Sequence, residues 1–158
     1  MASSVFVESD LRSDFRMRWS GWLETYEHAR GGGAGIPDVQ ILVDRYLVPI
    51  ELKRAELVGS RLFSDTIRPA QISWHFRFQE AGGRSFFMFG MVVGGRINHY
   101  LAPALVVKEH RTTGLILEKH CFKISASERV NRDDHLFTES LVRIILTSGA
   151  FQNKKSGA

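Results

Sequence analysis

Two acids and a lysine stand in a short, otherwise apolar part of the chain. The stretch "GIPDVQILVDRYLVPIELKRAE" contains Asp38 directly after a proline, and Glu51 two residues before Lys53. A buried hairpin would favour apolar residues at these positions, because burying a charge without a partner costs free energy. These three residues are therefore the first candidates for chemistry.

The apolar segments around Asp44-Arg45 predict a β-hairpin with strands over Val39–Val43 and Leu47–Leu52. If Val43 pairs with Tyr46, each pair outward keeps residue numbers that sum to 89, and Asp38 falls opposite Glu51. Alternate residues of a strand share a face, so Glu51 and Lys53 are neighbours on one side of the sheet. This register brings two carboxylates and an ammonium together.

Two adjacent carboxylates repel, and a divalent cation between them removes that repulsion. Oxygen ligands suit Mg²⁺ or Mn²⁺, which also accept water and phosphate oxygens. Lys53 would orient or help to deprotonate an attacking water, or stabilise charge in the transition state. This set of groups is suited to hydrolysing a phosphodiester. The alternative is a surface hairpin with a Glu–Lys pair and a capping aspartate, which is a common arrangement.

Several further elements must position these residues. Apolar residues at spacings of three and four predict a helix from Glu8 to Arg30, which Ser20-Gly21 could break. We expect residues 55–66 to form a loop, and residues 67–83 to form a helix with Pro69 in its first turn and Gly82 just past its end. Residues 85–93 predict a buried strand.

The last third of the chain gives weaker signals. Residues 97–107 and 114–124 predict further strands, the first broken by Pro103. Residues 133–149 predict a closing helix with Asp133 or Asp134 as its cap. The order of elements predicts an α/β domain with a mixed β-sheet flanked by helices. We expect one domain over residues 1–150 and a disordered tail over 151–158.

Composition narrows the class of protein. The chain has 158 residues, a net charge of +4, 44% hydrophobic residues and a single cysteine, Cys121. This is a globular composition without an internal disulfide, and it favours a reducing compartment. No apolar run reaches the length of a membrane span, and the basic balance weakly favours a polyanionic partner. We expect no membrane association and a cytoplasmic location.

The hairpin resembles the PD-(D/E)XK nuclease motif, with Pro37-Asp38 and Glu51-Leu52-Lys53 as its two halves. The following segment, "IRPAQISWHFRFQEAGGRSFFMFGMV", resembles its counterpart in virus-type replication–repair nucleases and Holliday-junction-resolvase-like enzymes of phages and bacteria. In those enzymes a helix carries Arg-Pro-x-Gln and Trp, and an apolar strand follows. The resemblance covers about residues 5–95 and implies a restriction-endonuclease-like core.

The resemblance also implies roles for single residues. Asp38 and Glu51 would bind Mg²⁺ or Mn²⁺, helped by the Leu52 carbonyl, and Lys53 would serve the attacking water. A glutamate of the first helix usually joins the metal ligands, and Glu8 matches best, with Glu24 as its competitor. Gln71 would lie near the site and contact the lysine, a ligand or DNA.

The implied activity is that of an endodeoxyribonuclease acting in phage or bacterial DNA recombination or repair. Branched DNA is the favoured substrate, and a homodimer would cut two strands in a coordinated way. Gly35, Arg61 and Arg68 are the expected DNA contacts, although the loop before the second helix is less basic than in similar phage enzymes. Seven arginines could line a phosphate-binding surface or instead form a solvated charged face, namely Arg12, Arg16, Arg18, Arg30, Arg54, Arg61 and Arg68.

The remaining reactive side chains give little sign of function. The histidines lack the paired spacing of zinc ligands, so we expect structural or surface roles for His75, His99, His110, His120 and His135. Cys121 is expected to be buried and inert. A catalytically inactive nuclease-like module that only binds DNA, or a nuclease for linear or single-stranded DNA, are the alternatives to a junction-cutting enzyme.

Overall fold

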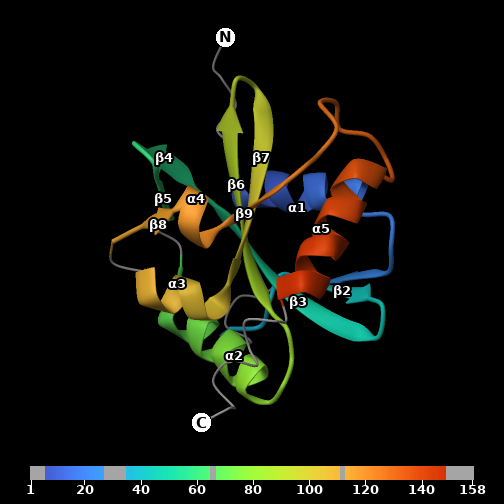
Figure 1. Ribbon diagram of the computed structural model, residues 1–158. Coiled ribbons are helices and arrows are strands. Elements are labelled where there is room, and N and C mark those ends of the chain that lie inside the picture. The colour runs from blue at the N-terminus through green and yellow to red at the C-terminus, as the bar shows by residue number, and fades with distance from the viewer. Residues whose placement is uncertain (1–5, 27–34, 65–66, 111–112, 149–158) are drawn as a thin grey trace.

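The protein is described from a computed structural model, which places residues 6–26, 35–64, 67–110 and 113–148. It has the predicted fold class, a mixed α/β domain in which helices flank a mixed sheet (Figure 1). Six strands form the main sheet in the order β1-β2-β3-β6-β7-β9, and three form a small second sheet in the order β4-β5-β8. The predicted tail, residues 151–158, the glycine run at 31–33 and Arg30 lie outside the described residues.

The strands of the main sheet are β1 (Leu23–Thr25), β2 (Val39–Val43), β3 (Tyr46–Arg54), β6 (Phe86–Val93), β7 (Arg96–Pro103) and β9 (Phe122–Ile124). The second sheet contains β4 (Glu56–Val58), β5 (Arg61–Phe63) and β8 (Leu115–Ile116). The helices are α1 (Glu8–Arg18), α2 (Pro69–Glu80), α3 (Ala104–His110), α4 (Leu117–His120) and α5 (His135–Ser148). Among these residues, no helix is both long and apolar enough to cross a membrane.

The β2–β3 hairpin has the predicted register. Val43 pairs with Tyr46 and Val39 pairs with Ile50, so the paired numbers sum to 89 along its length. Asp44 lies in the turn with a φ of 55°, a left-handed conformation that aspartate tolerates better than most residues. On its other edge β3 pairs in parallel with β6, and α2 forms part of the crossover between them.

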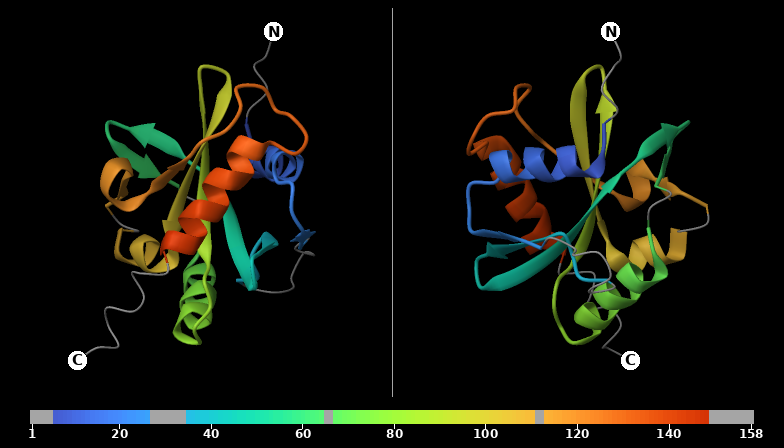
Figure 2. Two further views of the ribbon diagram at one scale, coloured as in Figure 1. Left: turned by 45° about the vertical axis from the view of Figure 1, so that its right-hand side comes forward. Right: turned by 180° about the vertical axis from the view of Figure 1, so that it is seen from behind.

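The main sheet carries helices on both faces, as Figure 2 shows from two sides. One face bears Val48, Ile50 and Leu52 of β3, which pack with apolar residues of α1 and α5. The opposite face bears Phe87 and Phe89 of β6, which pack with residues of α2 and α3. Because residues alternate along a strand, Glu51 and Lys53 share this second face with the phenylalanines opposite them. The site residues thus sit between the sheet and α2.

The first helix is shorter than predicted. It ends at Arg18, and residues 23–25 form the edge strand β1 instead of continuing the helix. The Trp19 ring is buried, and a Cβ on Gly21 would lie 2.7 Å from it, so the chain turns closely around this ring. Strand pairing of Leu23 with Ile41 then overrides the helical spacing of the aromatic residues.

The structure confirms some of the other predicted elements and contradicts others. The segments 69–80 and 86–93 form the predicted helix and strand, and 135–148 form the predicted closing helix. The predicted loop at 55–66 is wrong over 56–58 and 61–63, which form β4 and β5. Both late segments also contain short helices, α3 after Pro103 and α4 after β8, where only strands were predicted.

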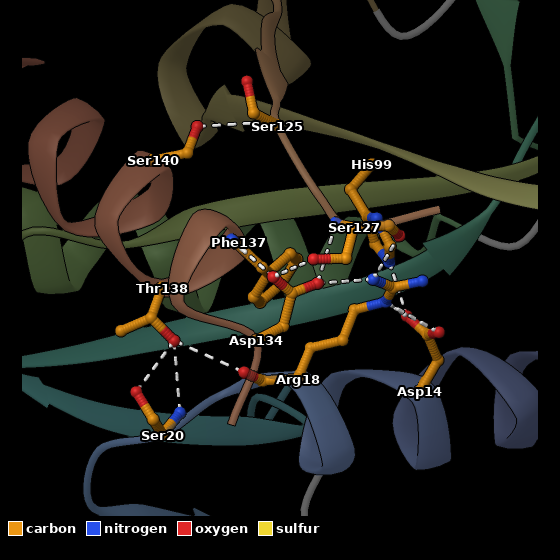
Figure 3. A network of polar contacts seen from close by, with 10 residues as sticks. All are labelled: Asp14, Arg18, Ser20, His99, Ser125, Ser127, Asp134, Phe137, Thr138 and Ser140. Atoms are coloured by element: carbon orange, nitrogen blue, oxygen red, sulfur yellow. Dashed lines mark hydrogen bonds and ion pairs between the residues drawn. The ribbon is translucent and has the colours of Figure 1, made fainter. Parts of the chain in front are cut away.

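A buried network of charged groups joins α1 to β7 and α5 (Figure 3). Arg18 donates from Nε to Asp14 Oδ1 at 3.0 Å and from Nη1 to Asp134 Oδ2 at 2.6 Å. His99 Nε2 lies 2.7 Å from Asp14 Oδ2. Arg18 is therefore part of the protein interior, and its prediction as a phosphate-binding surface residue is wrong. The network fixes α1 against the sheet, and with it the residues that α1 brings to the site.

Candidate active site

Asp38 lies one residue before β2 and is held by two donors. Its Oδ2 accepts the backbone N–H of Leu52 at 2.9 Å, across the hairpin. Its Oδ1 accepts Nη2 of Arg12 at 3.0 Å, from α1. The side chain is buried, so both contacts act with little competition from solvent. The hairpin register and α1 together set the position of this carboxylate.

Glu51 and Lys53 project from β3 toward α2, and both are almost fully buried, with 1% and 3% of their surface exposed. Lys53 Nζ lies 3.4 Å from Glu51 Oε1. Burial, followed by the nearby Asp38 carboxylate, raises the pKa of Glu51 to about 8, against the lowering effect of Lys53. The structure therefore brings the predicted carboxylates and ammonium into one buried cluster.

Gln71, in the first turn of α2, orients Glu51. Its Oε1 accepts the backbone N–H of Arg68 at 2.9 Å, which satisfies a donor at the start of the helix. That bond leaves Nε2 to donate to Glu51 Oε1 at 2.6 Å. Gln71 was expected to contact the lysine, a ligand or DNA, and the structure shows a contact with Glu51, an expected metal ligand. The helix start thus fixes one oxygen of the carboxylate.

His75 is a site residue that the sequence reasoning missed. It is fully buried, and its Nε2 lies 3.8 Å from Glu51 Oε2. Burial lowers the pKa of His75 to about 4, so the ring is neutral at neutral pH and the contact is not an ion pair. Both ring nitrogens and Glu51 Oε2 lack a hydrogen-bond partner among the described residues. The spacing of four residues after Gln71, which puts both on one helix face, was the available signal.

The structure distinguishes Glu8 from Glu24, the two glutamates considered as the metal ligand from the first helix. Glu8 begins α1, and its Oε1 lies 3.7 Å from Lys53 Nζ. Glu24 lies on the edge strand β1 opposite Gln40, two strands away from β3. The structure brings Glu8 to the cluster and leaves Glu24 outside it.

The expected DNA contacts are more scattered. Gly35 is buried with a φ of 93°, and a Cβ there would lie 2.6 Å from the Ala70 carbonyl, so packing against α2 accounts for this glycine. Arg61 lies in the second sheet and donates to the Thr113 carbonyl at 2.8 Å. Arg68 is exposed at the start of α2, next to Gln71. Of the three, only Arg68 is linked to the cluster, because its backbone N–H bonds to Gln71, which in turn contacts Glu51.

The cluster fits a hard divalent cation. Among the described residues, no group of three or more His, Cys, Asp or Glu side chains is arranged to hold a metal ion. Mg²⁺ and Mn²⁺ need fewer protein ligands, because water and phosphate oxygens complete their shells. Two buried carboxylates form a donor set that such a cation would satisfy, because the pKa of Glu51 is raised and its Oε2 lacks a hydrogen bond among the described residues. Asp38 and Glu51 are the residues that could hold it.

The other reactive groups lie outside this cluster. Cys121 is partly buried and not fully buried as expected, but this burial raises the pKa of its thiol to about 12, which agrees with an inert cysteine. His99 belongs to the buried network, and the rings of His110 and His120 lie against each other with centroids 3.9 Å apart and planes tilted by 38°. These positions agree with structural roles.

Comparisons with known proteins add a distant fold similarity. No family model matches the chain, and no curated protein matches it. Among solved structures, Hjc from Archaeoglobus fulgidus, a Holliday junction resolvase from an archaeal hyperthermophile, is similar with a TM-score of 0.43 and 14% identity. The similarity covers 82% of this chain and 88% of that one. At this distance it carries no argument about what the chain does.

Proposed function

We propose that the protein is a divalent-metal-dependent endodeoxyribonuclease that hydrolyses phosphodiester bonds. One observation carries the proposal. Asp38, Glu51 and Lys53 lie together in a buried cluster, and Glu51 holds its proton unusually tightly while a second carboxylate stands beside it. A buried carboxyl group with a strongly raised pKa and a specific charged partner is typical of a functional site.

In this proposal Asp38 and Glu51 hold Mg²⁺ or Mn²⁺, with Glu8 and the Leu52 carbonyl as further ligands suggested by the resemblance to PD-(D/E)XK nucleases. The bound cation supplies Lewis-acid chemistry, polarising the phosphodiester and favouring ionisation of water. Gln71 holds Glu51 in place. Lys53 orients the attacking water and stabilises the negative charge that develops on the phosphate.

The proposed reaction is the hydrolysis of a DNA phosphodiester bond. Water attacks phosphorus, the bond from phosphorus to the 3′ oxygen breaks, and the leaving oxygen takes a proton. The products are a 5′-phosphate and a 3′-hydroxyl, as the resemblance implies. The positive net charge of +4 supports a polyanionic substrate.

Branched DNA is the proposed substrate, in phage or bacterial recombination or repair, with a homodimer as the acting form. The support is the resemblance of the Arg68-Pro69-x-Gln71 segment to the corresponding segment of resolvase-like enzymes. A homodimer would supply two equivalent sites for the two strands of a symmetric junction.

The test is cleavage of labelled four-way junction, flap, single-stranded and linear duplex DNA, each with Mg²⁺, Mn²⁺ or EDTA. Asp38→Ala and Lys53→Ala proteins of intact fold are compared with the wild type. We expect junction cutting that needs metal and is lost in both variants. Cutting of linear or single-stranded DNA instead would keep the nuclease and remove the preference for branches. DNA binding without cutting under either metal would indicate an inactive binding module.

A further inference from the structure

Arg12 contacts the site in a way that the proposed mechanism does not use. It lies one turn after Glu8 on α1, and its Nη2 donates to Asp38 Oδ1 at 3.0 Å. Its side chain is 29% exposed, whereas the Asp38 side chain is 8% exposed. A guanidinium at the edge of the site thus neutralises one of the two acids from the solvent side.

The contact occupies the oxygen of Asp38 that a cation would need. The other oxygen, Oδ2, accepts the Leu52 N–H inside the hairpin, a bond set by the backbone register. A divalent cation bound at Oδ1 would place its charge beside the Arg12 guanidinium, and like charges at this range repel. Metal and guanidinium therefore compete for the same carboxylate oxygen.

The displaced side chain would have a natural partner. Guanidinium groups bind phosphate oxygens in a bidentate manner, and a DNA phosphate has to approach the same acids to be cut. Arg12 is long and flexible, and its Nε is buried without a hydrogen-bond partner among the described residues, so the guanidinium has donors left to use.

We infer that Arg12 is an exchangeable internal cation, which neutralises Asp38 in the metal-free protein and moves to the phosphate of the bound strand when a divalent cation takes its place. This rests on the proposed nuclease function. It makes Arg12 a group that lowers metal affinity in the absence of DNA and contributes to substrate binding in its presence.

The first test measures Mn²⁺ binding to the DNA-free protein by isothermal titration calorimetry. Arg12→Gln removes the competitor, and we expect Mn²⁺ to bind about three- to tenfold more tightly, the range for losing a charge-assisted hydrogen bond of a part-exposed group. Arg12→Lys keeps a cation and should bind Mn²⁺ about as the wild type does. Thermal unfolding of each variant confirms that the fold is intact.

The matched control is Arg16→Gln, on the same helix and one turn further on. Arg16 is exposed and has no ion pair among the described residues, so this variant loses the same charge without losing a contact at the site. We expect a change in Mn²⁺ affinity of less than about twofold, because exposed charges are screened. An equal gain in Mn²⁺ affinity in both variants would overturn the exchange, because the loss of any positive charge on the helix would then explain the gain.

The second test measures DNA binding by fluorescence anisotropy in a Lys53→Ala background, with a labelled four-way junction and Mn²⁺. Arg12→Gln should weaken binding about tenfold, and Arg16→Gln by clearly less. Unchanged or weaker Mn²⁺ binding by Arg12→Gln, or unchanged DNA binding, would overturn the inference while leaving the nuclease proposal standing. Absence of Mn²⁺ binding by the wild type would overturn both.

Discussion

The behaviour of the site depends on the protonation of Glu51. Burial and the neighbouring Asp38 raise its pKa to about 8, so the metal-free protein holds a proton there at neutral pH. A cation can bind this carboxylate only after that proton leaves, and metal affinity and proton affinity are therefore linked.

We expect Mn²⁺ affinity to rise by up to about tenfold per pH unit between pH 6 and pH 8, and to level off as Glu51 becomes ionised without metal. The sign follows from the raised pKa, because the protonated fraction falls as pH rises through it. Titration calorimetry at pH 6, 7 and 8 in two buffers of different ionisation enthalpy measures both affinity and proton release. A flat profile with no proton release would show that the Glu51 carboxyl is already ionised in the metal-free protein.

The same carboxyl should affect folding. Its pKa in the metal-free folded protein is above the unfolded value, so its stabilising contribution is complete below about pH 4.5 and is lost as pH rises toward 8. Added Mn²⁺ should offset that loss at the upper end of the range, since a ligand of the folded state stabilises it.

His75 provides a prediction about buried polar atoms. Its two ring nitrogens have no partner in the described residues, and the ring packs 4.8 Å from the Phe87 ring. Replacing it by an apolar residue of similar volume removes unsatisfied donors and acceptors. We therefore expect His75→Leu to raise the free energy of unfolding of the metal-free protein by about 1 kcal/mol, measured by urea denaturation.

His99→Leu is the matched control for this substitution. His99 is equally buried, but its Nε2 lies 2.7 Å from Asp14 Oδ2, so its loss leaves a buried carboxylate with one partner fewer. We expect His99→Leu to lower stability by about 1–3 kcal/mol. Similar destabilisation by both substitutions would mean that His75 also has a partner, such as an ordered water.

At the residue level, the sequence was informative where strand pairing decides position. The hairpin register follows from two apolar runs and a central Asp-Arg, so the approach of Asp38 to Glu51 could be predicted. Arg12 and His75 could not be placed in this way, because each reaches the site from a helix, and the spacing of His75 from Gln71 gives only a shared helix face. Their positions depend on helix-to-sheet packing, which sequence spacing alone does not give.

At the level of elements, the position of α1 decides whether Glu8 and Arg12 reach the site. That position depends on the buried network of Asp14, Arg18, His99 and Asp134 (Figure 3). Asp134 also caps α5, because its Oδ1 accepts the Phe137 N–H at 3.2 Å. Burial alone would raise the pKa of Asp134, but hydrogen bonds from Ser127, Phe137 and Arg18 outweigh it and hold the pKa below its usual value.

We expect Asp134→Ala to lower the free energy of unfolding by about 3–5 kcal/mol, because it leaves Arg18 buried with one partner fewer and removes the helix cap. Asp133→Asn is the control. Asp133 is exposed and has a φ of 54°, which asparagine tolerates, so its change should stay within about 0.5 kcal/mol. Urea denaturation of both proteins measures the difference. Equal, small effects would show that the network does not hold α1.

Long or strongly patterned elements were predictable, and short ones were not. The helix α2 begins with a proline and is followed by a glycine, and β6 is an uninterrupted apolar run, so local signals agree with the fold. The short strand β1 lies in a segment with helical spacing, and only its pairing with β2 makes it a strand. The strands β4 and β5 have only three residues each, too few for a clear alternation.

At the level of the whole molecule, the proposal requires two copies of the chain. Each chain brings together one Asp38–Glu51–Lys53 cluster, and under the proposed function one such site would cut one strand at a time. Resolution of a symmetric four-way junction needs two cuts on opposed strands, which two sites related by a two-fold axis would make within one encounter.

Cleavage of a supercoiled plasmid that extrudes a cruciform distinguishes an enzyme that acts as a dimer from one that acts as a monomer. A dimer that cuts both strands before leaving converts the plasmid to linear product, whereas a monomer first accumulates nicked circles. We expect mainly linear product with the wild type. An equimolar, fully exchanged mixture with Lys53→Ala should reduce linear formation to about a quarter, because random two-fold pairing gives about a quarter of dimers two intact sites and about half only one. Nicked circles should increase in proportion. Linear product that falls only by half, in line with the wild-type content, would mean that each chain completes both cuts without a partner.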